Sequence, residues 1–235
     1  VSIALSGTQV TSSPTPLVFT TANWNVTQIV TVTAIDDAIV EGNHTGSVTS
    51  VVTSADTNYD GSTVAPVSVS ITDNDSAGVS IVQSGGTTTV TEGGATDSYT
   101  VVLTSQPSAS VSIALSGTQV TPSPTPLVFT TANWNVTQTV TVTAIDDAIV
   151  EGNHTGSVTS VVTSADTNYD GATVAPVSVA ITDNDAAGVS IVQSGGTTTV
   201  TEGGATDSYT VVLTSQPSAN VSIALSGTQV TPSPT

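Results

Sequence analysis

The chain repeats itself with a period of 110 residues, and this repeat limits its fold more than any other feature. The decapeptide Val-Ser-Ile-Ala-Leu-Ser-Gly-Thr-Gln-Val begins at Val1, Val111 and Val221. Residues 1–110 and 111–220 differ at six positions, which are Ser12/Pro122, Ile29/Thr139, Ser62/Ala172, Ser70/Ala180, Ser76/Ala186 and Ser110/Asn220. A unit of this length exceeds a solenoid repeat and matches the size of one small β-sandwich domain. The repeat therefore predicts tandem copies of such a domain.

The repeat is out of phase with the domains that it predicts. Small residues and a glycine follow a predicted strand at residues 185–188, and such a segment is typical of a domain boundary. We therefore predict the C-terminal part of one unit over residues 1–75, a complete unit over 76–185 and the N-terminal part of a further unit over 186–235. Both chain ends then fall inside units, as expected for a window of a longer array.

Strict alternation of apolar residues with Ser and Thr predicts the strands of the complete unit. Val, Ile and Thr favour strands over helices, and no segment carries a helix pattern. The proline-rich residues 122–126 predict an edge strand or a loop, because proline cannot donate ladder hydrogen bonds. The expected fold is all-β, with tandem immunoglobulin-like antiparallel sandwiches of about seven strands each. The expected strands are 79–91 with a break at residues 85–86, 99–104, 111–115, 127–129, 139–145, 157–164 and 177–181.

The charge of the chain excludes several classes of partner. The chain has 18 Asp and Glu residues, two His and no Lys or Arg, which gives a formal net charge of −18. Such a chain repels nucleic acid and anionic membrane surfaces, and no apolar run is long enough for membrane insertion. The absence of cysteine excludes disulfides and thiolate metal sites. His44 and His154 have no nucleophile in their sequence context, so we expect no enzymatic activity.

The acidic residues gather where predicted strands end. In the complete unit Glu92 follows the first strand, residues 146–151 follow the fifth and residues 183–185 end the last. Like charges about 4 Å apart repel by roughly 4 kcal/mol at an effective dielectric constant of about 20, and no basic residue relieves them. The three strand ends can meet at one end of the sandwich, and hard oxygen ligands of this kind suit Ca²⁺. The alternative is that each acid is an ordinary solvated turn residue.

The candidate calcium ligands are one set that recurs with the repeat. The complete unit holds all of it, so we expect one full calcium site per chain, or two where chains join end to end. The set is Glu92, Asp146, Asp147, Glu151, Asp183 and Asp185 in the complete unit, Asp36, Asp37, Glu41, Asp73 and Asp75 in the preceding unit, and Glu202 in the following one.

Three phrases of the unit resemble those of a known family. Thr-Val-Thr-Glu-Gly, Ile-Asp-Asp-x-x-x-Glu-Gly and Ile-Thr-Asp-Asn-Asp are similar to the motifs of the Calx-β domain, an immunoglobulin-like sandwich found in sodium–calcium exchangers, integrin β4 and very large bacterial surface proteins. The resemblance covers the whole 110-residue unit and implies calcium ligands at the six acids of the complete unit. His154 stands where the family has a further acid, and proline-rich sequence replaces a Ser-Asp-Tyr segment. Both departures imply fewer or weaker ions.

Two longer phrases, Phe-Thr-Thr-Ala-Asn-Trp-Asn and Ser-Ala-Asp-Thr-Asn-Tyr-Asp-Gly, are similar to tandem repeats of bacterial adhesins. With the Calx-β resemblance they imply a calcium-binding structural repeat of an extracellular bacterial surface protein, a stiff rod or fibre for adhesion. The linker 185–188 is short, so the acidic end of one unit is expected near the base of the next, where an ion would restrain bending. The expected partners are neighbouring repeats of the same chain or identical chains.

Two alternative functions stay open at the sequence level. In the first, the chain is a self-assembling extracellular filament subunit, because residues 188–220 would supply by strand addition the strands that residues 1–75 lack. In the second, the chain is a carbohydrate-binding module in which Trp134 stacks on surface glycans.

Overall fold

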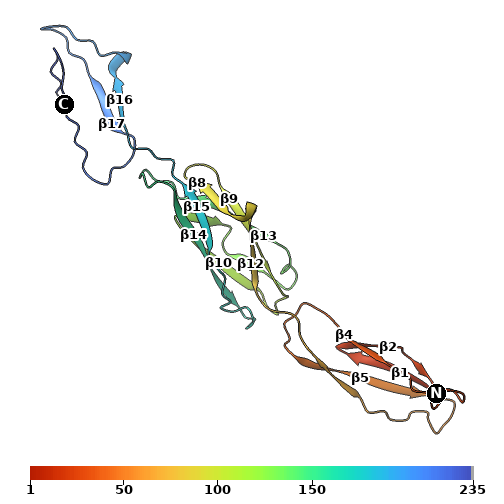
Figure 1. Cartoon of the computed structure of the whole chain (residues 1–235). Coiled ribbons are helices and arrows are strands. Elements are labelled where there is room, and N and C mark those ends of the chain that lie inside the picture. Colours follow the sequence, from red (N-terminus) through yellow and green to blue (C-terminus); the bar gives the residue numbers. More distant parts are fainter. Residues whose placement is uncertain (234–235) are drawn as a thin grey trace.

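The computed structural model describes residues 1–233 as three β bodies that follow one another along an extended molecule, with the chain ends at opposite ends (Figure 1). Residues 234–235, the end of the segment expected over 186–235, lie outside the described residues. The structure is nearly all β, as the alternating pattern predicts. In the described part of the chain the helical segments are two short 3₁₀ turns, Ser84–Gly86 and Ser194–Gly196. No helix among residues 1–233 is long and apolar enough to cross a membrane.

The strands of residues 1–71 form two sheets. A four-stranded sheet has the order β3-β1-β5-β6, and β2 pairs with β4 in a second sheet. We call residues 1–75 the head. Its strands are β1 Ser2–Thr8, β2 Val10–Ser13, β3 Leu17–Val18, β4 Thr31–Ala34, β5 His44–Thr53 and β6 Val67–Ile71.

Residues 79–182 form a sandwich of a five-stranded sheet, ordered β12-β10-β14-β15-β8, and a four-stranded sheet, ordered β11-β13-β9-β7. We call residues 76–185 the middle unit. Its strands are β7 Val79–Gln83, β8 Thr88–Thr91, β9 Asp97–Leu103, β10 Val111–Thr118, β11 Val120–Ser123, β12 Leu127–Phe129, β13 Gln138–Ala144, β14 His154–Ser164 and β15 Val177–Thr182. Beyond it, in residues 186–233, β16 Val189–Gln193 pairs with β17 Tyr209–Leu213. We call this last segment the tail.

The core of the middle unit lies between its two sheets. The predicted alternation places Val140 and Val142 of β13 at 0% exposure, while the threonines between them face solvent. Tyr99 and Val101 of β9 point into the same core. These apolar residues pack with those of β10, β12, β14 and β15 into one continuous cluster. In the head, by contrast, the buried cluster contains Val10, Val48 and Ile71 alone among the described residues.

One expected strand divides between the sheets and one further strand, β11, forms at the start of the predicted edge or loop, so the middle unit has nine strand segments where the pattern predicts about seven. The expected strand 79–91 divides at Gly85 (φ 61°) and Gly86 (φ 85°), whose left-handed backbone favours glycine. It leaves the four-stranded sheet as β7 and joins the five-stranded sheet as β8. The expected strand 111–115 extends to Thr118 as β10, and Gln119 (φ 59°) separates it from β11. Since β8 pairs in parallel with β15, the expected antiparallel sandwich contains one parallel pair.

The proline-rich segment is an edge, as predicted. Strand β11, which contains Pro122, lies at one edge of the four-stranded sheet and pairs only with β13. An edge position suits proline because one side of the strand needs no donor.

A buried Tyr–Ser–Asp cluster fastens the turn after β9 to the turn after β14. The Tyr169 side chain is fully buried, and its hydroxyl donates to Ser105 O at 2.7 Å and accepts from Ser105 N at 3.1 Å. The Asp166 carboxylate accepts hydrogen bonds from Ser108 N at 2.7 Å and Asn168 N at 2.9 Å. Burial by itself raises the pKa of Asp166, but these backbone hydrogen bonds outweigh it and lower the pKa below its usual range.

We expect Asp166→Asn to destabilise the middle unit by about 1–3 kcal/mol at neutral pH, because the buried amide has one acceptor oxygen where the carboxylate accepts from both Ser108 N and Asn168 N. A carboxyl with a lowered folded pKa stabilises the fold above its ordinary pKa of about 3.9 and loses that contribution as the pH falls through the lowered value. The difference between wild type and variant in thermal melts should therefore be constant near neutral pH and shrink in acid. Asp56→Asn is the matched control, because Asp56 accepts from Asn58 but has no counterpart of Ser108. Equal effects of the two substitutions would contradict the assignment.

Candidate metal centre

The acidic residues of the middle unit lie where three strands end. Strand β8 runs into Glu92, β13 runs into Asp146 and Asp147, and β15 runs into Asp183 and Asp185. Because β8 and β15 are parallel neighbours, with Thr91 opposite Thr182, their last residues lie at the same edge of the sheet. A hydrogen bond from Glu92 N to Thr182 O at 3.1 Å continues this pairing. The parallel pair therefore brings Glu92 beside the carboxylates that follow β15.

Asp183 organises the loops around it through the backbone. Its Oδ2 accepts hydrogen bonds from Glu151 N at 2.8 Å and Gly152 N at 2.6 Å, and its Oδ1 accepts one from Asp185 N at 2.8 Å. The bonds from Asp185 and Gly152 lower the pKa of Asp183, so the carboxylate stays ionised. It thereby fixes the segment of residues 146–152 against the end of β15.

Glu92 is the most unusual residue of the cluster, because its carboxylate is buried among other acids. The residue is 3% exposed. Burial, and then the charge of Asp183, raise the pKa of Glu92. Burial, and then the charges of Asp183, Asp146 and Asp147, likewise raise the pKa of Asp185. In both cases burial and neighbouring negative charges together disfavour the ionised carboxylate.

His154 faces the same carboxylates with one ring nitrogen. Its Nδ1 lies 2.9 Å from Gly152 O and therefore carries the proton of that hydrogen bond. Its Nε2 lies 3.7 Å from Glu92 Oε1 and 3.6 Å from Glu151 Oε2. Within residues 1–233, His154 Nε2 and Asp185 Oδ2 are buried atoms without a hydrogen-bond partner. A bound cation would supply a partner for buried acceptor atoms that face an acidic cluster in this way.

Asp146 and Asp147 lie on the other side of the cluster. Asn184 Nδ2 donates to Asp146 Oδ1 at 3.2 Å, and Ile149 N donates to Asp147 Oδ1 at 2.7 Å. A Cβ atom at Gly93, whose φ is +57°, would lie 3.1 Å from both carboxylate oxygens of Asp146. Glycine at this position therefore lets the Glu92 turn approach Asp146 closely.

Four of the six acids of the middle unit fall into two tighter groups that share Glu92, whereas Asp146 and Asp147 lie outside both groups. In each group one ligand atom per residue lies within 4.8 Å of the others. The groups are Glu92 with Glu151 and His154, and Glu92 with Asp183 and Asp185. The carboxylate oxygens fit Ca²⁺, while the imidazole nitrogen of His154 is a poor ligand for a hard cation. His154 differs from the Calx-β pattern in the sequence, and its position in the cluster has no local sequence signal.

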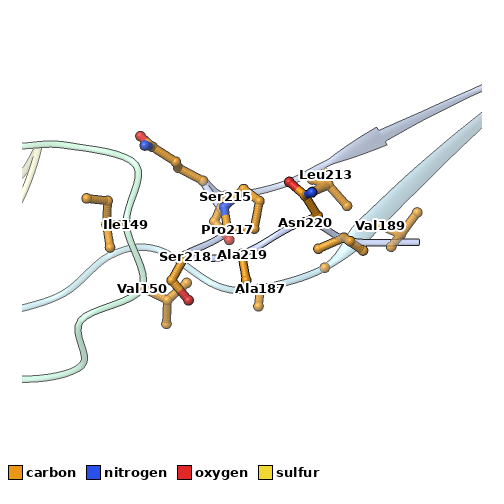
Figure 2. A pocket seen from close by; sticks show the side chains of 13 residues that line it. Ile149, Val150, Ala187, Val189, Leu213, Ser215, Pro217, Ser218, Ala219 and Asn220 are labelled. Atoms are coloured by element: carbon orange, nitrogen blue, oxygen red, sulfur yellow. The ribbon is translucent and has the colours of Figure 1, made fainter. Parts of the chain in front are cut away.

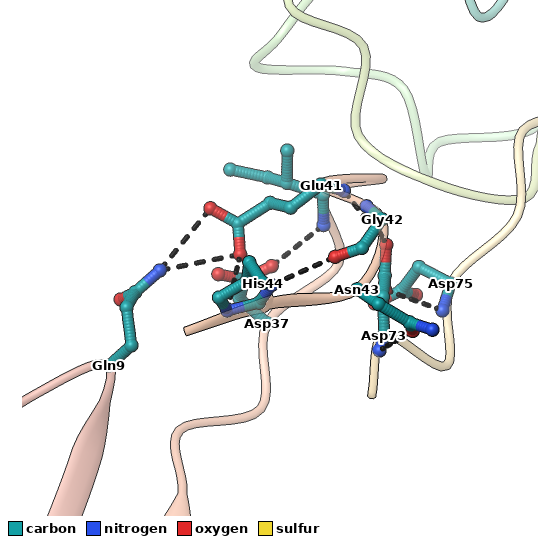
Figure 3. A network of polar contacts seen from close by, with 9 residues as sticks. Gln9, Asp37, Glu41, Gly42, Asn43, His44, Asp73 and Asp75 are labelled. Atoms are coloured by element: carbon teal, nitrogen blue, oxygen red, sulfur yellow. Dashed lines mark hydrogen bonds and ion pairs between the residues drawn. The ribbon is translucent and has the colours of Figure 1, made fainter. Parts of the chain in front are cut away.

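The head carries a partial copy of this arrangement (Figure 3). Asp73 Oδ2 accepts from Glu41 N at 2.8 Å and Gly42 N at 2.6 Å, as Asp183 does in the middle unit. His44 Nε2 lies 3.4 Å from Glu41 Oε2, and Gln9 Nε2 donates to Glu41 at 3.2 Å. Asp36, Asp37 and Asp75 complete the set, but the head has no counterpart of Glu92. Glu202, the counterpart in the tail, is exposed and lies far along the chain from these acids.

The acidic loop of each unit also touches the next unit. Gln106 N donates to Ala38 O at 2.6 Å, and Ile39 forms an isolated parallel bridge with Gln106. The contact repeats one period later, where Ile149 bridges to Gln216 and Gln216 N donates to Ala148 O at 2.6 Å. At this second junction Ile149 and Val150 face residues 215–219 across a pocket of about 590 Å³ (Figure 2). The loop that presents Asp146, Asp147 and Glu151 is therefore also the connection between units.

The candidate sugar-stacking residue Trp134 is less exposed than the corresponding tryptophan of the head. Trp134 is partly buried and packs against the core of the middle unit, and its carbonyl oxygen accepts from Leu103 N at 3.1 Å. Trp24, its counterpart in the head, is 71% exposed.

No protein-family model matches the chain, and no curated protein does. Among solved structures, the chain is similar in part to the D0–D1 domain of intimin, with 13% identity, a TM-score of 0.29 and coverage of 76% of this chain and 78% of that one. It is also similar in part to domains 4–9 of the surface layer protein SbsC, with 15% identity, a TM-score of 0.32 and coverage of 71% of this chain and 22% of that one. TM-scores this low carry no argument about function.

Proposed function

We propose that the chain is a non-enzymatic calcium-binding repeat of an extracellular bacterial surface protein, whose units form a stiff rod. The observation that carries the proposal is the buried Glu92 carboxylate, which shares one strand-end cluster with Asp183, Asp185 and Glu151. The chain has no Lys or Arg to compensate these charges, and the single imidazole of His154 beside Glu92 and Glu151 cannot balance the cluster. A divalent cation would compensate them and satisfy the unpartnered Asp185 Oδ2.

Glu92, Asp146, Asp147, Glu151, Asp183 and Asp185 would hold the ion or ions in the middle unit. The head would hold a smaller set of the same ligands, which are Asp36, Asp37, Glu41, Asp73 and Asp75. In the tail the corresponding ligand would be Glu202. The Calx-β resemblance supports calcium as the ion and the cell surface as the location.

Calcium would stiffen the rod through the loop of residues 146–152. Asp183 holds this loop through two backbone hydrogen bonds, and its Ala148 and Ile149 contact Gln216 of the next unit. An ion shared by Asp146, Asp147 and Glu151 would fix the loop further and restrain bending at the junction. The calcium site and the junction would then act as one mechanical element.

Calcium titration by isothermal calorimetry tests the site. We expect wild-type protein to bind calcium and Glu92→Gln to weaken the binding at least tenfold, because the substituted side chain keeps the size of glutamate but loses its charge. Asp207→Asn is the matched control: it removes the same charge from an acid that accepts hydrogen bonds from Thr199 N and Ser208 N outside the cluster. Absence of binding to the wild type, or equal loss in both variants, would refute the proposed site.

A further inference from the structure

We propose that Glu92, Glu151 and His154 form a second metal site, which takes a borderline divalent transition metal of the Zn²⁺ type. The site shares Glu92 with the proposed calcium site but requires no calcium ion, and all three residues belong to the middle unit. One ligand atom from each residue lies within 4.8 Å of the others. The imidazole of His154 distinguishes this group from the purely acidic residues around it.

The ring of His154 presents a free lone pair to the two carboxylates. Its Nδ1 lies 2.9 Å from Gly152 O, so Nδ1 carries the proton and Nε2 is left as an acceptor. Nε2 is buried and has no hydrogen-bond partner within residues 1–233. A histidine that ligates a metal generally donates its other ring N–H to a backbone carbonyl or a carboxylate, which fixes the ring. His154 therefore has the tautomer and the orientation of a metal ligand.

The spacing of the three side chains fits a metal ion better than direct contacts. His154 Nε2 lies 3.7 Å from Glu92 Oε1 and 3.6 Å from Glu151 Oε2, too far for hydrogen bonds. In a tetrahedral zinc site, metal–ligand bonds of about 2.0–2.2 Å place neighbouring nitrogen and oxygen ligands roughly 3.4 Å apart. The observed separations therefore need only a small contraction around an ion.

Glu92 lies at the closed side of the site. Its side chain is 2% exposed, and within residues 1–233 its carboxylate accepts no hydrogen bond. The side chains of His154 and Glu151 are 20% and 32% exposed, so an ion can enter between them. A cation bound there would give the buried carboxylate the partner that the fold does not provide.

Three adjacent strands hold the ligands in place. His154 is the first residue of β14 and lies opposite Ile181 of β15, which pairs in parallel with β8. Glu92 directly follows β8, at the sheet edge where β14 begins. Gly152, with a φ of 71°, turns the chain between Glu151 and His154. Ligands carried by paired strands are positioned more precisely than ligands on loops, so little ordering is needed when an ion binds.

The donor atoms decide between the two kinds of cation. One imidazole nitrogen and two carboxylate oxygens suit Zn²⁺ and its first-row neighbours, and three protein ligands leave a position for water. The other group, Glu92 with Asp183 and Asp185, offers oxygen donors alone, which suit calcium. The cluster therefore offers different donors to two cations, with Glu92 common to both.

Calorimetric titration of the full-length chain with zinc alone and with calcium alone tests the assignment. We expect the wild type to bind both ions. His154→Gln should weaken zinc binding by roughly tenfold or more, because it removes the imidazole ligand, and should leave calcium affinity unchanged. Asp185→Asn is the matched counterpart: it removes a carboxylate from the calcium group and should weaken calcium binding far more than zinc binding.

Nitrogen NMR of the histidine ring identifies the ligand without a change in the site. In a His44→Gln chain the one remaining imidazole belongs to His154. Zinc should shift the Nε2 resonance and leave Nδ1 protonated, because Gly152 O holds that proton. Calcium should not ligate Nε2.

Three results would overturn the inference: a wild type that does not bind zinc, zinc binding that leaves the Nε2 resonance unshifted, and equal zinc affinity in the wild type and His154→Gln. Any of them together with retained calcium binding would leave the proposed function intact. Zinc binding through Nε2 without calcium binding would support the second site and refute the calcium site alone.

Discussion

Chelation of calcium is expected to lower the melting temperature of the middle unit by roughly 15 °C or more. Free calcium at about 1,000 times the dissociation constant stabilises a folded state by about 4.1 kcal/mol. For a domain of this size, 1 kcal/mol shifts the melting temperature by roughly 4–8 °C. Removal of the ion also leaves the Glu92 carboxylate without a compensating charge, at a place where burial, and then the charge of Asp183, raise its pKa. Differential scanning calorimetry with calcium and with excess chelator measures the shift.

Glu92→Gln separates this effect from a general response to ions. The substitution removes one buried charge, so the metal-free variant should melt above the metal-free wild type, and added calcium should raise its melting temperature much less. Asp207→Asn should behave as wild type in both respects. If chelator leaves the wild-type melting temperature unchanged, calcium does not stabilise this fold and the rod model in its calcium-dependent form is wrong.

Local patterns were sufficient to predict the strands of the fold but insufficient to predict how they pair. The alternation around Val140 and Val142 correctly assigns inward and outward faces, because side-chain direction in a strand depends only on its period of two. Gly85 and Gly86 correctly mark a break. The pattern does not reveal that the break transfers the chain to the opposite sheet, because that transfer depends on which strand edge is free, a property of the whole sandwich.

The candidate site was partly predictable for the same reason. Acids at strand ends can be recognised from sequence, but only the parallel pairing of β8 with β15 places Glu92 beside Asp183. The burial of Glu92 and the orientation of His154 follow from tertiary packing and have no local sequence signal. The loop contact between Ile39 and Gln106 was expected only as a general proximity of one unit to the next.

Phe129→Ala should destabilise the middle unit by about 3–5 kcal/mol, because removal of a fully buried phenylalanine forfeits its transfer free energy and leaves a cavity. Phe19→Ala makes the same chemical change at the corresponding position of the head. Phe19 is only half-buried and already lines an open cavity. Its substitution should therefore cost much less than that of Phe129.

Urea denaturation of the two variants measures both costs. Phe129 belongs to a continuous core cluster of the middle unit, whereas the buried cluster of the head contains Val10, Val48 and Ile71. Equal costs for the two variants would mean that the head packs Phe19 as tightly as the middle unit packs Phe129.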